Sequence, residues 1–206
     1  NEDVVRVYSR GGRPLVRFDA EELGFVEDAA LSGNGELLAV AGPEETRVIR
    51  VGSGGTAARI VQPLTSVAFT PDGSRLVGGT RDGQVLIRGL RGPRSRIVLD
   101  GHTQPVSDVE VSGDGTLLVS AGTDRVARVW DAVTGAEIAE LRGHERALRS
   151  AGFGAGQTIV TGADDGTARF WEAPVTSVLA GHTGPIVALA VTPDGARVAT
   201  ASSEEG

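Results

Sequence analysis

The stretch that decides the fold is Gly101–Asp131, GHTQPVSDVEVSGDGTLLVSAGTDRVARVWD. It begins with Gly-His, carries an Asp-Gly turn at Asp114, and ends in Trp-Asp. Each mark recurs along the chain. Gly-His pairs place histidines at His102, His144 and His182, at spacings of 42 and 38 residues, and Trp130 lies 41 residues before the second tryptophan. Because independent marks share one spacing, the sequence predicts internal repeats.

Each repeat is predicted to consist of short β-strands with alternating apolar and polar residues. Residues 64–70, 74–80 and 84–90 alternate apolar and polar side chains and are rich in β-branched residues, which favour strands. Asp-Gly sequences separate the three runs, and Gly adopts the positive φ that tight hairpins need. No stretch of ten or more residues has a helical apolar stripe. The sequence therefore predicts an all-β protein.

The repeated block resembles a WD40 repeat. Gly143–Glu172 is similar, with Glu as its last residue, and Gly181–Gly206 resembles a shortened third copy. The resemblance implies a β-propeller of four-stranded antiparallel blades around a channel, with about five blades represented. The expected units are a partial blade at 1–18, blades at 25–62, 64–99, 106–141 and 148–179, and a partial blade at 186–206.

Four whole units and two half units make an open arc of blades, so this chain by itself is expected to form an incomplete ring. An open arc leaves an apolar sheet face uncovered at each end, so further blades are expected to close it. The favoured prediction is that the segment is an arc of a larger ring in a longer chain, because the sequence starts without Met and stops within a repeat. Two alternatives stay open. Val4–Phe18 could pair with Ile186–Ser202 to complete a fifth blade, or a second copy could supply the missing blades.

The resemblance also implies a hydrogen-bonded tetrad of His, Ser or Thr, Asp and Trp within a blade. Such bonds satisfy buried imidazole and indole groups. Arg88 and Val51 are predicted to occupy the Trp position in the earlier units, which therefore lack a tetrad. The predicted tetrads are His102, Ser120, Asp124 and Trp130; His144, Thr161, Asp165 and Trp171; and an incomplete set of His182, Thr200 and Glu204.

Composition excludes several classes of site. The 206 residues include no Cys, so neither a disulfide nor a thiolate metal site is possible, and with 3 His we expect no metal and no cofactor. A net charge of −7, in which every basic residue is Arg, argues against nucleic acid and anionic membrane as partners. The sequence has no signal-peptide pattern and no long apolar run, so a cytoplasmic location is expected.

We therefore predict a non-catalytic scaffold that binds a protein or peptide. His102, Ser120 and Asp124 have the composition of a nucleophilic triad, but the set recurs in each blade, which favours a structural role. The alternative is a sensor or regulatory propeller of a larger bacterial enzyme, an NTPase, kinase or protease. Propellers that resemble this one bind through the loops at one end, and the matching positions are Arg81, Thr103, Gln104, Thr123, Glu145, Arg146, Asp164, Thr183 and Ser203.

Three other features are expected to be structural. Asp72, Asp114 and Asp194 precede Gly in turns that lack the acid density of a calcium loop, so they should bind their own turn backbone. Gly52–Gly55 lacks the Lys of a phosphate-binding loop. Arg88, Arg91, Arg94 and Arg96 form a basic cluster, interpreted as a solvated loop, with docking of an acidic peptide or a phosphate as the functional alternative.

Overall fold

The computed structural model describes residues 4–20, 23–91, 95–154, 158–171, 176–192 and 197–203. In these ranges the chain forms strands and turns and no α-helix, and no helix there is long and apolar enough to cross a membrane. Strands that follow one another in sequence pair antiparallel in every sheet. The prediction of an all-β fold made of four-stranded antiparallel sheets is confirmed.

The four complete sheets follow in order along the chain. The first is β3 (Asp28–Leu31), β4 (Leu37–Ala41), β5 (Thr46–Arg50) and β6 (Thr56–Ile60). The second is β7 (Ser66–Phe69), β8 (Arg75–Gly79), β9 (Gln84–Gly89) and β10 (Arg96–Asp100). The third is β11 (Val106–Val111), β12 (Leu117–Gly122), β13 (Val126–Asp131) and β14 (Glu137–Arg142). The fourth is β15 (Leu148–Phe153), β16 (Ile159–Ala163), β17 (Thr167–Trp171) and β18 (Thr176–Ala180).

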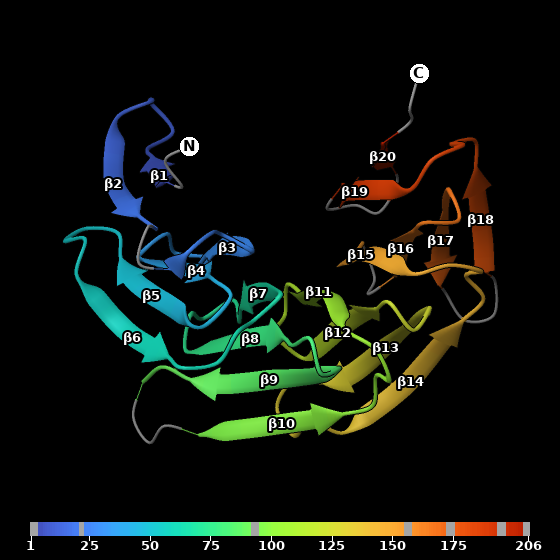
Figure 1. The fold of residues 1–206 in the computed structure, drawn as a ribbon, viewed down its shortest axis with the longest axis horizontal. Helices are drawn as coiled ribbons and strands as arrows, with labels where there is room; N and C mark the ends of the chain where they lie inside the picture. The colour runs from blue at the N-terminus through green and yellow to red at the C-terminus, as the bar shows by residue number, and fades with distance from the viewer. Residues whose placement is uncertain are drawn as a thin grey trace.

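The sheets stand side by side as blades of an arc, with the first strand of each blade toward the middle and the last strand at the outer rim (Figure 1). The inner strands β3, β7, β11 and β15 contact one another in that order. Two hairpins end the arc, β1 (Val4–Tyr8) with β2 (Pro14–Asp19), and β19 (Ile186–Val191) with β20 (Val198–Ser202).

These hairpins lie at opposite tips of the arc in Figure 1 and form separate two-stranded sheets. The alternative in which residues 4–18 pair with residues 186–202 to complete one blade is therefore wrong for this structure. The two hairpins do not reach each other, because four blades turn the chain through only part of a circle (Figure 1).

Small residues on the second strand of a blade let the next blade approach. A Cβ on Gly79 of β8 would lie 2.5 Å from Val106 Cγ1, and one on Gly162 of β16 would lie 2.6 Å from Ile186 Cγ2. Both apolar side chains are fully buried. Because any larger residue would collide with a packed side chain, the spacing between blades depends on these glycines.

The pairing register corrects one predicted position. Leu118 pairs with Trp130 across β12 and β13, whereas the equivalent Leu38 pairs with Ile49 across β4 and β5. Ile49, not Val51, therefore occupies the Trp position of that blade. A shorter turn accounts for one of the two residues of this shift, because four residues separate the paired Ala41 and Thr46, whereas five separate the equivalent Ala121 and Ala127.

Candidate interaction face and its supporting network

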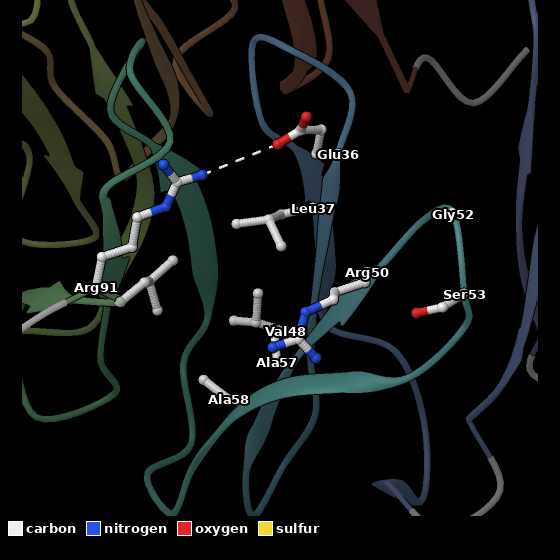
Figure 2. Close-up of a pocket in the computed structure, with 10 residues that line it drawn as sticks. Glu36, Leu37, Val48, Arg50, Gly52, Ser53, Ala57, Ala58 and Arg91 are labelled. Atoms are coloured by element: carbon white, nitrogen blue, oxygen red, sulfur yellow. Dashed lines mark ion pairs between the residues drawn. The ribbon is translucent and has the colours of Figure 1, made fainter.

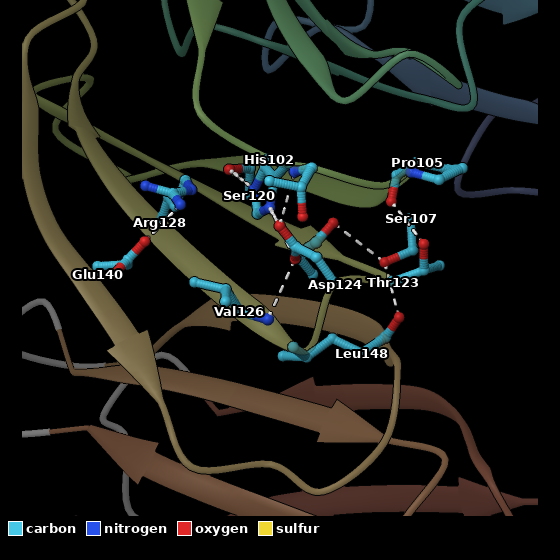
Figure 3. Close-up of polar contacts among 12 residues, drawn as sticks. His102, Pro105, Ser107, Ser120, Thr123, Asp124, Val126, Arg128, Glu140 and Leu148 are labelled. Atoms are coloured by element: carbon cyan, nitrogen blue, oxygen red, sulfur yellow. Dashed lines mark hydrogen bonds and ion pairs between the residues drawn. The ribbon is translucent and has the colours of Figure 1, made fainter.

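The blade β11–β14 contains a continuous hydrogen-bonded chain of side chains, of which Figure 3 shows His102, Ser120 and Asp124. Trp130 Nε1–H donates to Ser120 Oγ at 2.9 Å, and His102 Nε2 lies 2.8 Å from the same hydroxyl. His102 Nδ1 lies 3.0 Å from Asp124 Oδ1. Since Ser120 has one proton and accepts from the indole, it donates to His102 Nε2, and Nδ1–H donates to the carboxylate. This polarity describes a neutral imidazole.

The next blade repeats the arrangement. Trp171 Nε1–H donates to Thr161 Oγ1 at 2.9 Å, His144 Nε2 lies 2.8 Å from that hydroxyl, and His144 Nδ1 lies 2.9 Å from Asp165 Oδ2. In the last hairpin, His182 Nε2 lies 2.9 Å from Thr200 Oγ1. Glu204, proposed as the acidic partner of that set, lies outside the described residues.

Burial sets the charge state of the histidines, and hydrogen bonds set that of Asp165. It lowers the pKa of His102 and of His144 below the ordinary value, although the neighbouring carboxylates act in the opposite direction. Burial alone would raise the pKa of Asp165, but hydrogen bonds from Thr167, the Glu145 backbone and His144 lower it to about 2. The blade therefore holds a neutral histidine against a charged aspartate.

The geometry of the Ser120 hydroxyl argues against nucleophilic chemistry. Its residue is 0% exposed, as is Thr161 in the next blade. Each hydroxyl already accepts an indole N–H and contacts an imidazole nitrogen. A nucleophile needs access to a substrate carbonyl, and neither oxygen has it.

The tetrad carboxylates also hold the exposed loops that precede the first strands. Asp124 Oδ2 accepts the backbone N–H of Thr103 at 3.0 Å, and Asp165 Oδ2 accepts that of Glu145 at 2.9 Å. Each carboxylate therefore connects a buried histidine to a backbone position at the surface. The network thereby fixes the shape of the loops at this end of the arc.

Hydroxyls on the inner strands or just before them join neighbouring blades at the same end. Thr65 Oγ1 donates to the Val106 carbonyl at 2.6 Å. Ser107 Oγ donates to the Leu148 carbonyl at 2.8 Å, and Figure 3 shows these two residues. Sequence reasoning missed both residues. Thr65 and Ser107 are 42 residues apart, so the period that located the histidines would have found them.

One residue further along the inner strands, carboxylates also form hydrogen bonds to the neighbouring blade. Asp28 Oδ2 accepts the backbone N–H of Val67 at 2.8 Å, and Asp108 Oδ2 accepts that of Ala151 at 3.0 Å. The Ser66 hydroxyl lies between them, 3.0 Å from Asp28 and 3.2 Å from Asp108. Burial, aided by the charge of Asp28, raises the pKa of Asp108 to about 6. Asp28, Ser66 and Asp108 line a hollow at this end of the blades, and sequence reasoning missed them as well.

A hollow of about 300 Å³ opens over this end of the inner strands. A second hollow of about 320 Å³ lies next to it and shares four lining residues, Glu27, Thr65, Ser107 and Arg149. Arg81 lines the first hollow and forms an ion pair with Glu27 from the preceding blade. Arg149 binds Asp164 through two hydrogen bonds of 2.7 and 2.8 Å. Together the hollows form one concave face built by loops of successive blades.

The structure places the predicted surface residues as follows. Arg81 and Thr123 line the hollow, and Asp164 reaches it through Arg149. Thr123 Oγ1 also donates to the Pro105 carbonyl at 3.2 Å (Figure 3). The remaining predicted positions are exposed on neighbouring loops and do not line the described hollows: Thr103, Gln104, Glu145, Arg146, Thr183 and Ser203.

The turn aspartates bind their own turns as expected. The backbone N–H of Ser74 donates to Asp72 Oδ1 at 3.0 Å, and that of Thr116 donates to Asp114 Oδ1 at 3.0 Å. Hydrogen bonds from Thr70 and Ser74 lower the pKa of Asp72 to about 2. Among the described residues, no group of three or more His, Asp and Glu could hold a metal ion. Asp194 and Arg94 lie outside the described ranges.

Comparison with known proteins gives the family. The model of the WD domain, G-beta repeat (WD40) matches residues 56–87, 93–131, 135–172 and 174–205. The first match runs from β6 into β9, and the third from the loop before β14 to just past β17. One sequence repeat therefore supplies the outer strand of one blade and the three inner strands of the next, which links successive blades covalently.

Individual relatives match only part of their own length. DENN domain and WD repeat-containing protein SCD1 of Arabidopsis thaliana is 30% identical over 135 residues, which cover 64% of this chain and 11% of that protein. NACHT domain- and WD repeat-containing protein 1 of Mus musculus is 35% identical over 74 residues, which cover 36% of this chain and 5% of that protein. Both relatives are eukaryotic and give no support to the predicted bacterial origin.

The fold has solved counterparts. The crystal structure of the RRP9 WD40 repeats superposes with a TM-score of 0.74 at 22% identity, and the match covers 81% of this chain and 54% of that one. The match supports a propeller architecture on geometry alone, since the sequences are distant. Because the family model matches more than half of the chain, in four successive repeats, the protein belongs to the WD40 repeat family.

Proposed function

We propose that the chain is a non-catalytic scaffold that binds a protein partner on the concave face over its inner strands. The observation that carries the proposal is that loops of consecutive blades converge on two adjoining hollows, of about 300 and 320 Å³. Concave sites of this size fit the side chains of an extended peptide. The buried hydroxyls of Ser120 and Thr161 support a role in binding rather than catalysis.

The charges of the face favour a partner with carboxylates. Arg81 and Arg149 have side chains that are 60% and 50% exposed, and each is paired with an acid of this chain. Each guanidinium has five N–H donors, so Arg81 and Arg149 can bind a partner carboxylate on their exposed sides while they keep Glu27 and Asp164. Arginine is also enriched among the residues that dominate binding energy at interfaces.

The test is selection of peptide ligands from a random displayed library with the intact chain, followed by titration against variants. We expect selected peptides to lose tenfold or more in affinity for the double variant Arg81→Gln, Arg149→Gln, and Arg146→Ala to weaken capture as well. Arg6→Gln is the matched control, because Arg6 is an exposed arginine on β1, away from this face. If the affinities do not change in the double variant, the proposal that the concave face binds the partner is wrong.

A second candidate is a regulatory module of a larger protein. The names of the two relatives described above combine WD repeats with a DENN or a NACHT domain. These names favour a WD-repeat module that is joined to a further domain, and they do not identify the activity of that domain. The sequence that flanks this segment in the natural protein decides the question. A P-loop or kinase motif would support the enzyme alternative, and repeats alone would exclude it. The bacterial source and the cytoplasmic location stay predictions.

A further inference from the structure

A separate pocket of about 430 Å³ lies between the blades β3–β6 and β7–β10 (Figure 2). Its floor is apolar and includes Leu37, Val48, Ala58 and Leu90. None of its lining residues is among those that line the two hollows of the concave face. The pocket is therefore a distinct feature, with a volume typical of ligand sites.

Small side chains on β6 account for the pocket. Ala58 pairs with Val48 in this blade, and at the equivalent position of the next blade Ile97 pairs with Ile87. There the space is filled, because a Cβ on Gly135 would lie 2.9 Å from Ile97 Cγ2. The methyl group of Ala58 is too short to make the corresponding contact. The opening therefore follows from the residue at this register position.

Two guanidinium groups stand at the rim of this apolar floor. Arg50 Nη1 donates to the Thr56 carbonyl at 3.0 Å, and among the described residues no carboxylate forms an ion pair with it. Arg91 Nη2 lies 3.9 Å from Glu36 Oε2, with both side chains more than 60% exposed, so this pair is weak (Figure 2). Most of the N–H donors of both arginines are thus available to an anion.

We propose that this pocket is a second binding site, which takes an acidic peptide segment of a partner protein. An aliphatic side chain of the peptide enters the floor beside Val48 and Ala58, and flanking carboxylates bind Arg50 and Arg91. The apolar floor provides burial and the guanidinium forks provide orientation. The chain carries a net charge of −7, which repels an anionic membrane and favours a short, local ligand over an extended anionic surface.

The probe is an array of acetylated pentapeptides with Leu, Ile, Val or Phe at the centre and Asp or Glu at the flanking positions. The same peptides with Gln in place of the acids serve as the charge control. Affinity is measured by fluorescence anisotropy against the intact chain and four variants, one of which, Arg149→Gln, reports on the concave face. Arg50→Gln removes the charge, Ala58→Ile fills the floor with the residue that the next blade carries, and Arg6→Gln controls for loss of an exposed arginine.

We expect at least one acidic peptide to bind, with a tenfold or greater loss in Arg50→Gln and in Ala58→Ile and no loss in Arg6→Gln. Thermal unfolding verifies that each variant folds. If Ala58→Ile does not fold, the affinity of Arg50→Gln alone tests the proposal. Absence of binding across the array, binding that both variants retain, or binding to phosphoinositide vesicles without any peptide binding would overturn the proposal. Loss in Arg149→Gln instead would assign the peptide to the concave face and leave the pocket empty.

Discussion

Glu110 on β11 extends across the blade boundary into space that is open only because residue 152 on β15 is glycine. A Cβ on Gly152 would lie 2.9 Å from Glu110 Oε2. The carboxylate also accepts the backbone N–H of Phe153 at a long 3.4 Å. Burial, opposed by that hydrogen bond and aided by the nearby Asp108 charge, raises the pKa of Glu110 to about 7. The blade contact thus contains an acid that is easily protonated.

Glu110→Gln should stabilise the protein in alkaline solution. Because the pKa of the folded state, about 7, exceeds the ordinary value of 4.5, the charged carboxylate is disfavoured by folding. This penalty is full above pH 8 and vanishes below pH 4, where both states are protonated. We expect the free energy of unfolding to rise by about 1–2 kcal/mol at pH 8 and by nothing at pH 4. Urea unfolding measures it.

The control for that variant is Glu145→Gln, the same change at an exposed position, which should alter stability by less than about 0.5 kcal/mol at either pH. A Glu110→Gln variant that is equally stable at pH 8, or less stable than the parent, would mean that the carboxylate is favourably bound when charged.

Trp130→Phe should cost about 1–3 kcal/mol, because the change removes the indole N–H that Ser120 Oγ accepts at 2.9 Å in a fully buried site. Trp171→Phe removes the equivalent bond to Thr161 from a less buried residue and should cost less. The measurement is urea unfolding, with the double variant Trp130→Phe, Ser120→Ala completing a cycle. Coupling below about 0.5 kcal/mol would contradict a cooperative network.

Gly83→Ala should destabilise the protein by at least about 2 kcal/mol. Gly83 has a φ of +81°, and a Cβ there would lie 2.4 Å from the His102 carbonyl oxygen, which belongs to the next blade. Gly113→Ala is the matched control, since no atom lies within 4 Å of its Cβ position. Thermal unfolding of the two variants tests the difference. Equal melting temperatures would show that the loop moves away without cost.

Arg125→Gly should stabilise the protein. Arg125 has a φ of +71° and is the one non-glycine residue in the described ranges with positive φ, at the turn position where the neighbouring blades carry Gly83 and Gly166. Relief of the left-handed backbone is worth about 1–2 kcal/mol, less the entropy that glycine adds to the unfolded chain. We expect a net gain of about 0.5–1 kcal/mol in urea unfolding. A loss would mean that the Arg125 side chain makes a compensating contact.

Much of the fold followed from local rules in the sequence. The Asp-Gly turns, the strand alternation and the recurring Gly-His and Trp predict hairpins and their spacing, since turn geometry and side-chain alternation act over a few residues. The resemblance to WD40 repeats added the tetrad partners within a blade. One predicted position was wrong, because strand pairing places Ile49, and not Val51, at the Trp position. The turn before Thr46 is one residue shorter than its counterpart, which accounts for one of the two residues of this difference.

By itself, the sequence determined the number and order of strands and the residues that repeat, because each depends on patterns within one repeat. Tertiary structure alone decided what happens between repeats. The Asp108 contact with Ala151, the Arg81 pair with Glu27 and the pocket beside Ala58 each join residues of two blades. Repeats that look alike in sequence differ there, because close packing makes a single methyl or a missing Cβ open or fill the space between sheets.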